Sequence, residues 1–152
     1  MNNLAGLLTE LETKVTQSEK INTAVSQTSV GWHIQHILLV GLQIITAVEK
    51  SNPADYKYKF SLPKFLVYTL NKIPRGKAKA PESVRPKETF NTDELKKNIQ
   101  LLKSRLVVLD TLQPRHFFKH PYFGNLNLKA TVKMLNLHTK HHLDIINDII
   151  RG

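Results

Sequence analysis

Two histidines, His138 and His142, stand four residues apart in a segment whose apolar pattern is that of a buried helix face. Their side chains would lie one above the other on that face. A neutral imidazole buried in a core needs partners for both ring nitrogens, and a metal ion can supply a partner for each residue. The face repeats at steps of three and four residues and comprises Leu128, Thr131, Leu135, His138, His142, Ile145 and Ile149.

A third histidine, His36, lies at a compatible depth in the predicted helix over residues 28–50. If this helix runs antiparallel to residues 127–150, the three rings lie at one level. Three imidazoles suit zinc, nickel, cobalt or iron(II) better than magnesium or calcium. Three protein ligands with a vacant position typify a catalytic metal site, where the ion can polarise a substrate oxygen or sulfur. The alternative is that each histidine is a hydrogen-bonded core residue.

Other histidines flank this set. His141 lies about 100° around the helix from His142, so we expect it to flank the site without binding the ion. His33, one turn before the predicted ligand of its helix, is a candidate general base, with an ordinary helix-side histidine as the alternative. His120, in the aromatic loop 115–124, is a second candidate acid or base, with loop stabilisation as the alternative.

Helical periodicity and capping residues predict the elements that must position these side chains. The segment 18–27 is polar and is expected to break the first helix from the second. A short helix is expected over 64–72, begun by Pro63. The four long helices begin at Asn2 or Asn3, at Thr28 or Ser29 (ending near Lys50), at Asn91 (ending before Pro114) and at Asn127.

These elements predict an all-α fold, a four-helix bundle in a single domain over residues 1–152. A short link makes the first two helices antiparallel. The segment 51–90 is long enough to cross the bundle, so helices two and three can be parallel. No alternating apolar and polar pattern predicts a strand.

Positive charge is concentrated in the segment 57–87. The chain has a formal net charge of +10, and nine basic residues against Glu82 give this segment +8. Such a segment could attract nucleic acid, an anionic membrane or an anionic small molecule, or could be a solvated loop. Lys77, Lys79 and Arg85 are the candidates for holding an anionic cofactor or substrate.

The composition and the N-terminal sequence bear on the cellular compartment of the protein. The chain contains no cysteine, which excludes disulfides and thiolate ligands and fits a reducing compartment. The first residues lack the features of a signal peptide, and the apolar run 34–47 is too short and too polar to span a bilayer. The sequence therefore predicts a cytoplasmic protein without a membrane partner.

The histidines stand in three short motifs, the first of which is Ser-Val-Gly-Trp-His-Ile-Gln-His-Ile over residues 29–37. This motif resembles the helix-two motif of the DinB-like (YfiT-type) metalloenzyme superfamily, in which the last histidine is a metal ligand. Residues 138–142, His-Thr-Lys-His-His, resemble its helix-four motif, whose first and last histidines are the other ligands. Residues 120–124, His-Pro-Tyr-Phe-Gly, resemble the His-Pro-x-Phe-Gly loop of an uncharacterised subgroup. The resemblance implies the ligand set His36, His138 and His142.

The chain departs from the superfamily at Asp144, where relatives often have glycine two residues after the last histidine. The resemblance implies a bundle with helices two and three parallel across a long crossover. It also implies a metal-dependent transferase of a low-molecular-weight thiol, or a hydrolase, acting on a small molecule. The implied cofactors are a divalent metal, zinc first with nickel, iron or cobalt as alternatives, and a low-molecular-weight thiol.

Two other functions compete with this one. A metal-binding bundle without catalysis remains open, because no carboxylate is convincingly placed as a general base. A nucleic-acid-binding or partner-binding bundle could use the basic segment 57–87. Nucleic acid is disfavoured, because few aromatic residues lie among these basic residues and no DNA-binding motif is present. The apolar surface of the first helix could support a homodimer.

Overall fold

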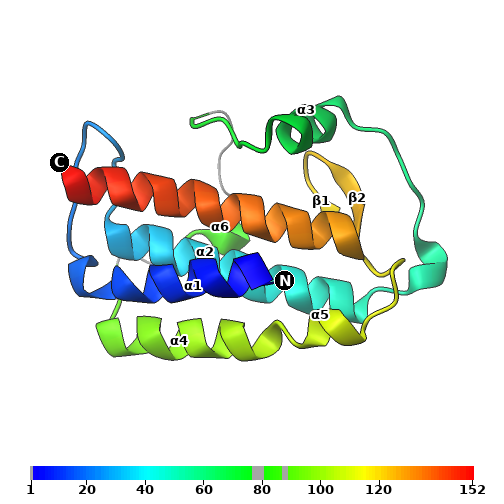
Figure 1. The fold of residues 1–152 in the computed structure, drawn as a ribbon, viewed down its shortest axis with the longest axis horizontal. Coiled ribbons are helices and arrows are strands. Elements are labelled where there is room, and N and C mark those ends of the chain that lie inside the picture. Colours follow the sequence, from blue (N-terminus) through cyan, green and yellow to red (C-terminus); the bar gives the residue numbers. More distant parts are fainter. Residues whose placement is uncertain (1, 77–80, 87–88) are drawn as a thin grey trace.

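Four long helices lie side by side in the computed structural model, which describes residues 2–76, 81–86 and 89–152 (Figure 1). α2 packs against α4 and α6, and α1 packs against the same two helices. α2 and α4 run in one direction, and α1 and α6 run in the opposite direction. The helices are α1 (Asn2–Thr13), α2 (Val30–Lys50), α3 (Leu62–Leu70), α4 (Thr92–Arg105), the one-turn α5 (Val108–Thr111) and α6 (Leu128–Arg151).

The prediction of an all-α four-helix bundle is wrong, because the chain also forms a two-stranded antiparallel sheet. β1 (Phe117–His120) pairs with β2 (Gly124–Asn127), with His120 opposite Gly124. Each strand has four residues, too few for an alternating pattern to be recognised in the sequence. Gly124 has a φ of 71°, a left-handed conformation that glycine adopts without strain. The fold is therefore mostly helical with one small hairpin.

Side-chain caps begin the helices that carry the histidines. The Ser29 hydroxyl accepts a hydrogen bond from the Trp32 amide at 3.2 Å and begins α2. The Asn127 side chain accepts one from the Ala130 amide at 3.0 Å and begins α6. Between α1 and α2, residues 18–29 are mostly turn and bend, so the predicted break is confirmed.

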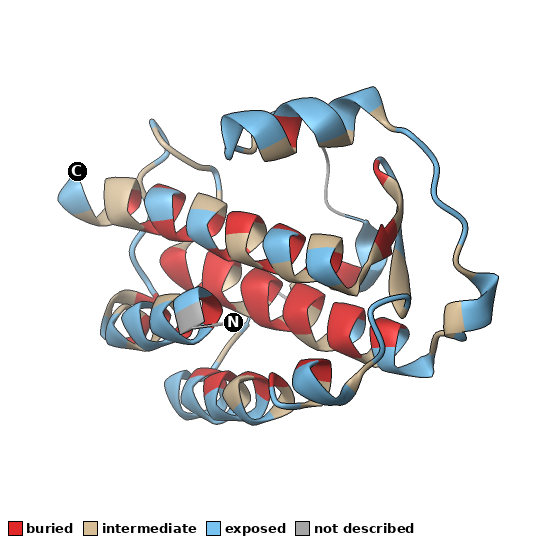
Figure 2. Cartoon of the chain, turned by 45° about the vertical axis from the view of Figure 1, so that its right-hand side comes forward, coloured by how far each residue is buried: buried red, intermediate tan, exposed pale blue. Residues whose placement is uncertain are grey.

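The main core lies between the long helices (Figure 2). α2 is buried along most of its length, because it contacts both α4 and α6. It is the one described helix long and apolar enough to cross a membrane, but much of it is buried inside the protein, as in the core helix of a soluble protein. In α1, Leu4, Leu8 and Leu11 are buried in this core and Leu7 is partly buried; Val15, just after the helix, is buried too.

A smaller core holds α3 against the hairpin and the start of α6. Val67 of α3 packs there with Phe123, Leu126 and Met134. The Tyr68 hydroxyl donates a hydrogen bond to the Ala130 carbonyl at 2.6 Å, which fixes α3 to α6. α3 therefore lies outside the main helices, as Figure 1 shows, and only one side of it is covered.

Candidate metal centre

Three histidines from two helices meet where α2 packs against α6. His36 comes from α2, and His138 and His142 come from successive turns of α6. One ring nitrogen from each lies within 4.8 Å of the others, so the three could hold a metal ion. The Nε2 atoms of His36 and His138 are 3.2 Å apart. Two nitrogens bound tetrahedrally to zinc at about 2.05 Å would be about 3.3 Å apart, so this pair fits such an ion.

A backbone carbonyl fixes the orientation of the His36 ring. His36 Nδ1 lies 2.7 Å from the carbonyl oxygen of Val84, which can only accept a hydrogen bond. Nδ1 must therefore carry the proton, and in the neutral ring Nε2 keeps its lone pair for an ion. The Trp32 ring stacks on the His36 ring, with the two centroids 5.2 Å apart. The segment 51–90 between α2 and α4, which we call the crossover segment, therefore orients a residue of α2 through Val84.

A chain of hydrogen bonds fixes the His142 ring. His142 Nδ1 lies 2.9 Å from His33 Nδ1, and His33 Nε2 lies 3.0 Å from the Ser26 hydroxyl and 3.2 Å from that of Thr28. If His142 binds an ion through Nε2, its Nδ1 carries the proton and donates to His33. His33 then carries its own proton on Nε2 and donates to a hydroxyl. His33 therefore acts on the site through His142, as a positioning residue.

Replacing His33 should weaken metal binding without removing a ligand. In a His33→Phe variant the buried His142 Nδ1 loses its partner, and we expect the dissociation constant of zinc to rise about 10- to 100-fold. A His33→Gln variant keeps an amide oxygen that can accept the hydrogen bond, so its zinc affinity should fall less than that of His33→Phe. Competition with a chromophoric chelator measures both values. Equal affinity for the wild type and His33→Phe would contradict the positioning role.

Burial keeps the clustered imidazoles in the neutral form that binds metal ions. Burial, together with the nearby His36, His141 and Arg75, lowers the pKa of His33 to about 4. Burial and the neighbouring histidines hold the pKa of His138 and of His142 well below the ordinary value. Burial also lowers the pKa of His36, although its hydrogen bond to Val84 acts in the opposite direction. The three imidazoles can therefore remain unprotonated, and able to bind a metal ion, at pH values below 7.

A cavity of about 640 Å³ opens onto the three histidines. α2, α3, α6, the hairpin and the crossover segment contribute to its walls, which are mostly carbon. Among the described residues, no aspartate or glutamate lines it, so its ionisable groups are the triad, His120, His141 and Tyr122. An ion held by three neutral ligands would therefore keep its full charge toward the cavity.

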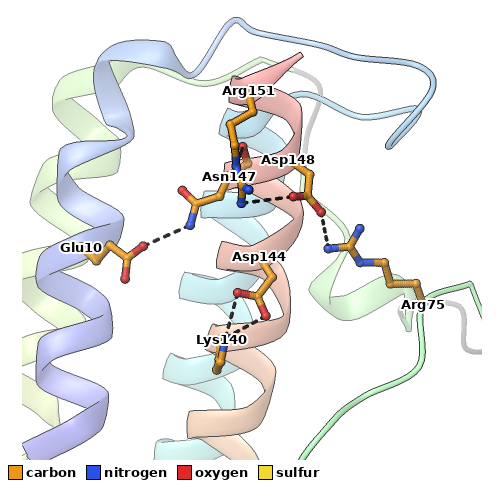
Figure 3. Close-up of polar contacts among 7 residues, drawn as sticks. All are labelled: Glu10, Arg75, Lys140, Asp144, Asn147, Asp148 and Arg151. Atoms are coloured by element: carbon orange, nitrogen blue, oxygen red, sulfur yellow. Dashed lines mark hydrogen bonds and ion pairs between the residues drawn. The ribbon is translucent and has the colours of Figure 1, made fainter.

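An ion pair joins α6 to the chain beside the cavity (Figure 3). Arg75, which lies between the cavity-lining residues Pro74 and Gly76, pairs with Asp148 at 2.7 Å. Asp144, two residues after His142, is exposed and pairs with Lys140 at 2.8 Å. Asp144 therefore makes a local ion pair on the surface of α6 and does not line the cavity.

His120 has a structural task at the turn of the hairpin. Its Nδ1 accepts hydrogen bonds from the amides of Tyr122 and Phe123, at 3.1 and 3.2 Å. Its ring stacks on that of Phe123, with centroids 4.3 Å apart. Nδ1 is therefore unprotonated, and the proton of the neutral ring is on Nε2. Because His120 also lines the cavity, it is the better placed of the two acid or base candidates, while His33 lies behind His142.

The titration of His120 predicts a pH dependence of stability. Burial lowers its pKa in the folded protein to about 4 from an ordinary 6.5. Between these values the unfolded chain binds more protons, so the free energy of unfolding falls as the pH falls from 6.5 toward 4. His120→Asn keeps an acceptor for the turn amides and removes the titration. Between about pH 7 and pH 5, metal-free His120→Asn should lose about 1–2 kcal/mol less stability than the wild type.

Urea unfolding across this pH range measures the difference. The absolute stability of the variant does not enter, because only the change with pH is compared. Parallel pH dependences for the wild type and His120→Asn would contradict the neutral state of the partly buried His120.

The structure leaves the predicted anion site mostly untested. Lys77 and Lys79 lie outside the described residues. Arg85 is exposed and is not among the residues that line the cavity. His141 lines the cavity but is not in the triad. The Val84 carbonyl was not predicted, because any residue type carries one.

The chain matches no protein-family model, and no curated protein or solved structure is significantly similar to it. The resemblance to the DinB-like superfamily therefore rests on three short motifs, and the activity that it implies remains a prediction.

Proposed function

We propose that this protein binds a divalent metal ion through His36, His138 and His142 and is a metal-dependent enzyme acting on a small molecule. The observation that carries the proposal is the clustering of the three histidines at the wall of a large cavity. A structural ion would be enclosed by four protein ligands, whereas this triad leaves a position facing the cavity. Such an ion supplies Lewis acidity toward a substrate oxygen or sulfur.

The charge balance favours a substrate or cofactor with an anionic head. Three neutral ligands do not offset the charge of a divalent ion, and among the described residues no carboxylate of the cavity does so. A thiolate would satisfy both the charge and the preference of borderline-soft ions. We therefore propose transfer to or from a low-molecular-weight thiol as the first activity to test, and hydrolysis of a small amide or ester as the second. Zinc is the first metal to test, and nickel, iron and cobalt follow.

The residues of the chain would position and shield the reacting groups. Trp32 and Phe118 form part of the apolar wall that excludes water around a bound molecule. His120 can donate from Nε2 toward the cavity, since its Nδ1 is engaged by the hairpin turn. Its lowered pKa keeps it neutral near pH 7, so it would be a hydrogen-bond donor there and not a cationic acid.

A metal-binding protein without catalysis is the second candidate. The observation that favours it is the lack of a carboxylate among the described residues of the cavity, which leaves histidines as the general bases. A cytoplasmic location, the absence of nucleic-acid binding and a homodimer remain predictions.

The deciding experiment is elemental analysis of the purified protein and of His138→Ala, followed by activity assays. We expect one equivalent of a transition metal in the wild type and far less in the variant. Turnover of an electrophile with a small thiol, or of an amide or ester, should be lost on metal removal and restored by the same ion. A metal-free wild type, or equal metal in both proteins, would overturn the proposal. Metal without turnover would favour the non-catalytic candidate.

A further inference from the structure

The outer side of α3 is apolar, although it faces solvent. Leu62, Phe65, Leu66 and Leu70 are between 48% and 71% exposed. Their spacing places them along one stripe of the helix. The opposite side carries Val67 and packs into the smaller core. Figure 2 shows the same division, with the exposed colour covering most of α3. A surface helix normally presents its polar side to water, so this orientation requires an explanation.

Two exposed aromatic residues extend this stripe. Tyr58 and Phe60 precede α3 and are 66% and 61% exposed. The Phe60 ring contacts the Phe65 ring, with centroids 6.3 Å apart. We define the α3 face as the exposed side chains of Tyr58, Phe60, Leu62, Phe65, Leu66 and Leu70. This face is a continuous run of the chain on a projecting element, and within the described residues no other segment covers it.

The stretch of sequence that carries the α3 face is rich in lysine and free of acidic residues. Lys57, Lys59, Lys64 and Lys72 lie along it, and the sequence from 56 to 81 contains no aspartate or glutamate. The Lys64 ammonium lies over the Tyr58 ring, 4.9 Å from its centroid. The partner that complements this face must therefore combine an apolar interior with a negatively charged surface.

We propose that the α3 face docks on the surface of a bilayer that contains anionic lipids. Leucine and phenylalanine side chains would enter the boundary between headgroups and acyl chains, and the lysines would contact the anionic headgroups. This mode of binding needs no membrane-spanning helix, so it revises the sequence-based expectation of no membrane partner.

The observations favour this partner over two others. A second copy would bring the four lysines of one face against those of the other, which is repulsive. Single-stranded nucleic acid would use the aromatic rings and the lysines, but it gives no role to Leu62, Leu66 and Leu70, because aliphatic side chains offer no stacking surface. The membrane surface accounts for the aliphatic, aromatic and basic residues together.

Vesicle co-sedimentation of the full chain tests the proposal. The wild type should sediment with phosphatidylcholine vesicles that also contain phosphatidylglycerol, and much less with phosphatidylcholine alone or at high salt. Leu66→Ser with Leu70→Ser, and separately Lys57→Glu with Lys59→Glu, should each lower the partition coefficient about tenfold or more. The substituted side chains are exposed, so these variants should fold, and circular dichroism checks that they do.

Matched controls lie on the far helix α4 and just after it. Leu101→Ser with Val107→Ser removes two other exposed apolar side chains, and Lys96→Glu with Lys97→Glu reverses two other exposed charges. Both controls should bind vesicles like the wild type.

Failure of the wild type to bind anionic vesicles would overturn the proposal, as would equal losses of vesicle binding in the control and α3 variants. The proposal would also be overturned if the α3 variants still bound vesicles but no longer formed dimers, or no longer bound oligothymidine. None of these measurements depends on the metal, so the result is separate from that for the metal site.

Discussion

Replacing His142 by alanine is expected to abolish tight metal binding, whereas replacing the adjacent His141 leaves it nearly unchanged. His142 is buried and belongs to the triad, and its ring is held by His33. His141 lines the cavity but does not belong to the triad. The loss on removing a ligand should exceed the roughly 10- to 100-fold expected for a residue that only supports one.

The neighbouring substitution is a stringent control, because the two histidines share one helix turn and both contribute to the cavity. Zinc affinity by chelator competition and metal content by elemental analysis measure the two variants. Circular dichroism establishes that both retain their helices. A similar loss of metal in His141→Ala would mean that the ligand set is wrongly assigned. Full retention in His142→Ala would remove the metal site from the proposal altogether.

The candidate site was largely predictable because its residues lie on long, regular helices. A spacing of four residues on a helix places His138 and His142 on one face whatever the rest of the fold does. Capping residues and apolar periodicity then fix where α2 begins and hence the depth of His36. That the three rings lie together follows from these local rules and from the antiparallel packing of α2 and α6.

The hairpin and the supporting contacts were not predictable in the same way. A four-residue strand such as Phe117–His120 carries no usable periodicity, and its pairing depends on a turn held by a histidine side chain. The hydrogen bond between His36 and the Val84 carbonyl joins residues 48 positions apart. Because every residue has a carbonyl, no residue type in the sequence marks this partner. The contact between His33 and His142 also depends on packing between helices.

A side chain at position 31 should disturb the attachment of the crossover segment to α2. Gly31 is buried at the start of α2, and a Cβ atom there would lie 2.3 to 2.7 Å from three carbons of the Phe90 ring. Phe90 immediately precedes Asn91, which caps α4. We expect Gly31→Val to lower the free energy of unfolding by about 2–3 kcal/mol, because the ring must leave its position.

A double-mutant cycle with Phe90→Ala separates this clash from other effects of the substitution. If the ring is the obstacle, Gly31→Val should cost at least about 1 kcal/mol less in the Phe90→Ala background than in the wild type. Gly6→Ala is the control for a glycine replaced within a helix, since nothing lies within 4 Å of its Cβ position. It should stabilise the protein by about 0.5–1 kcal/mol through helix propensity. Urea unfolding measures all the variants.

The packing of Phe90 against Gly31 should also affect zinc binding at the histidine site. Phe90 is the last residue of the crossover segment 51–90, which also carries the Val84 carbonyl that orients His36, so displacing the Phe90 ring should also loosen that hydrogen bond. Zinc affinity should therefore fall in Gly31→Val, although the substituted residue contacts no ligand. Full affinity in a destabilised Gly31→Val would show that the Val84 contact is held independently of Phe90. Additive effects of the two substitutions on stability would show that the ring moves aside at little cost.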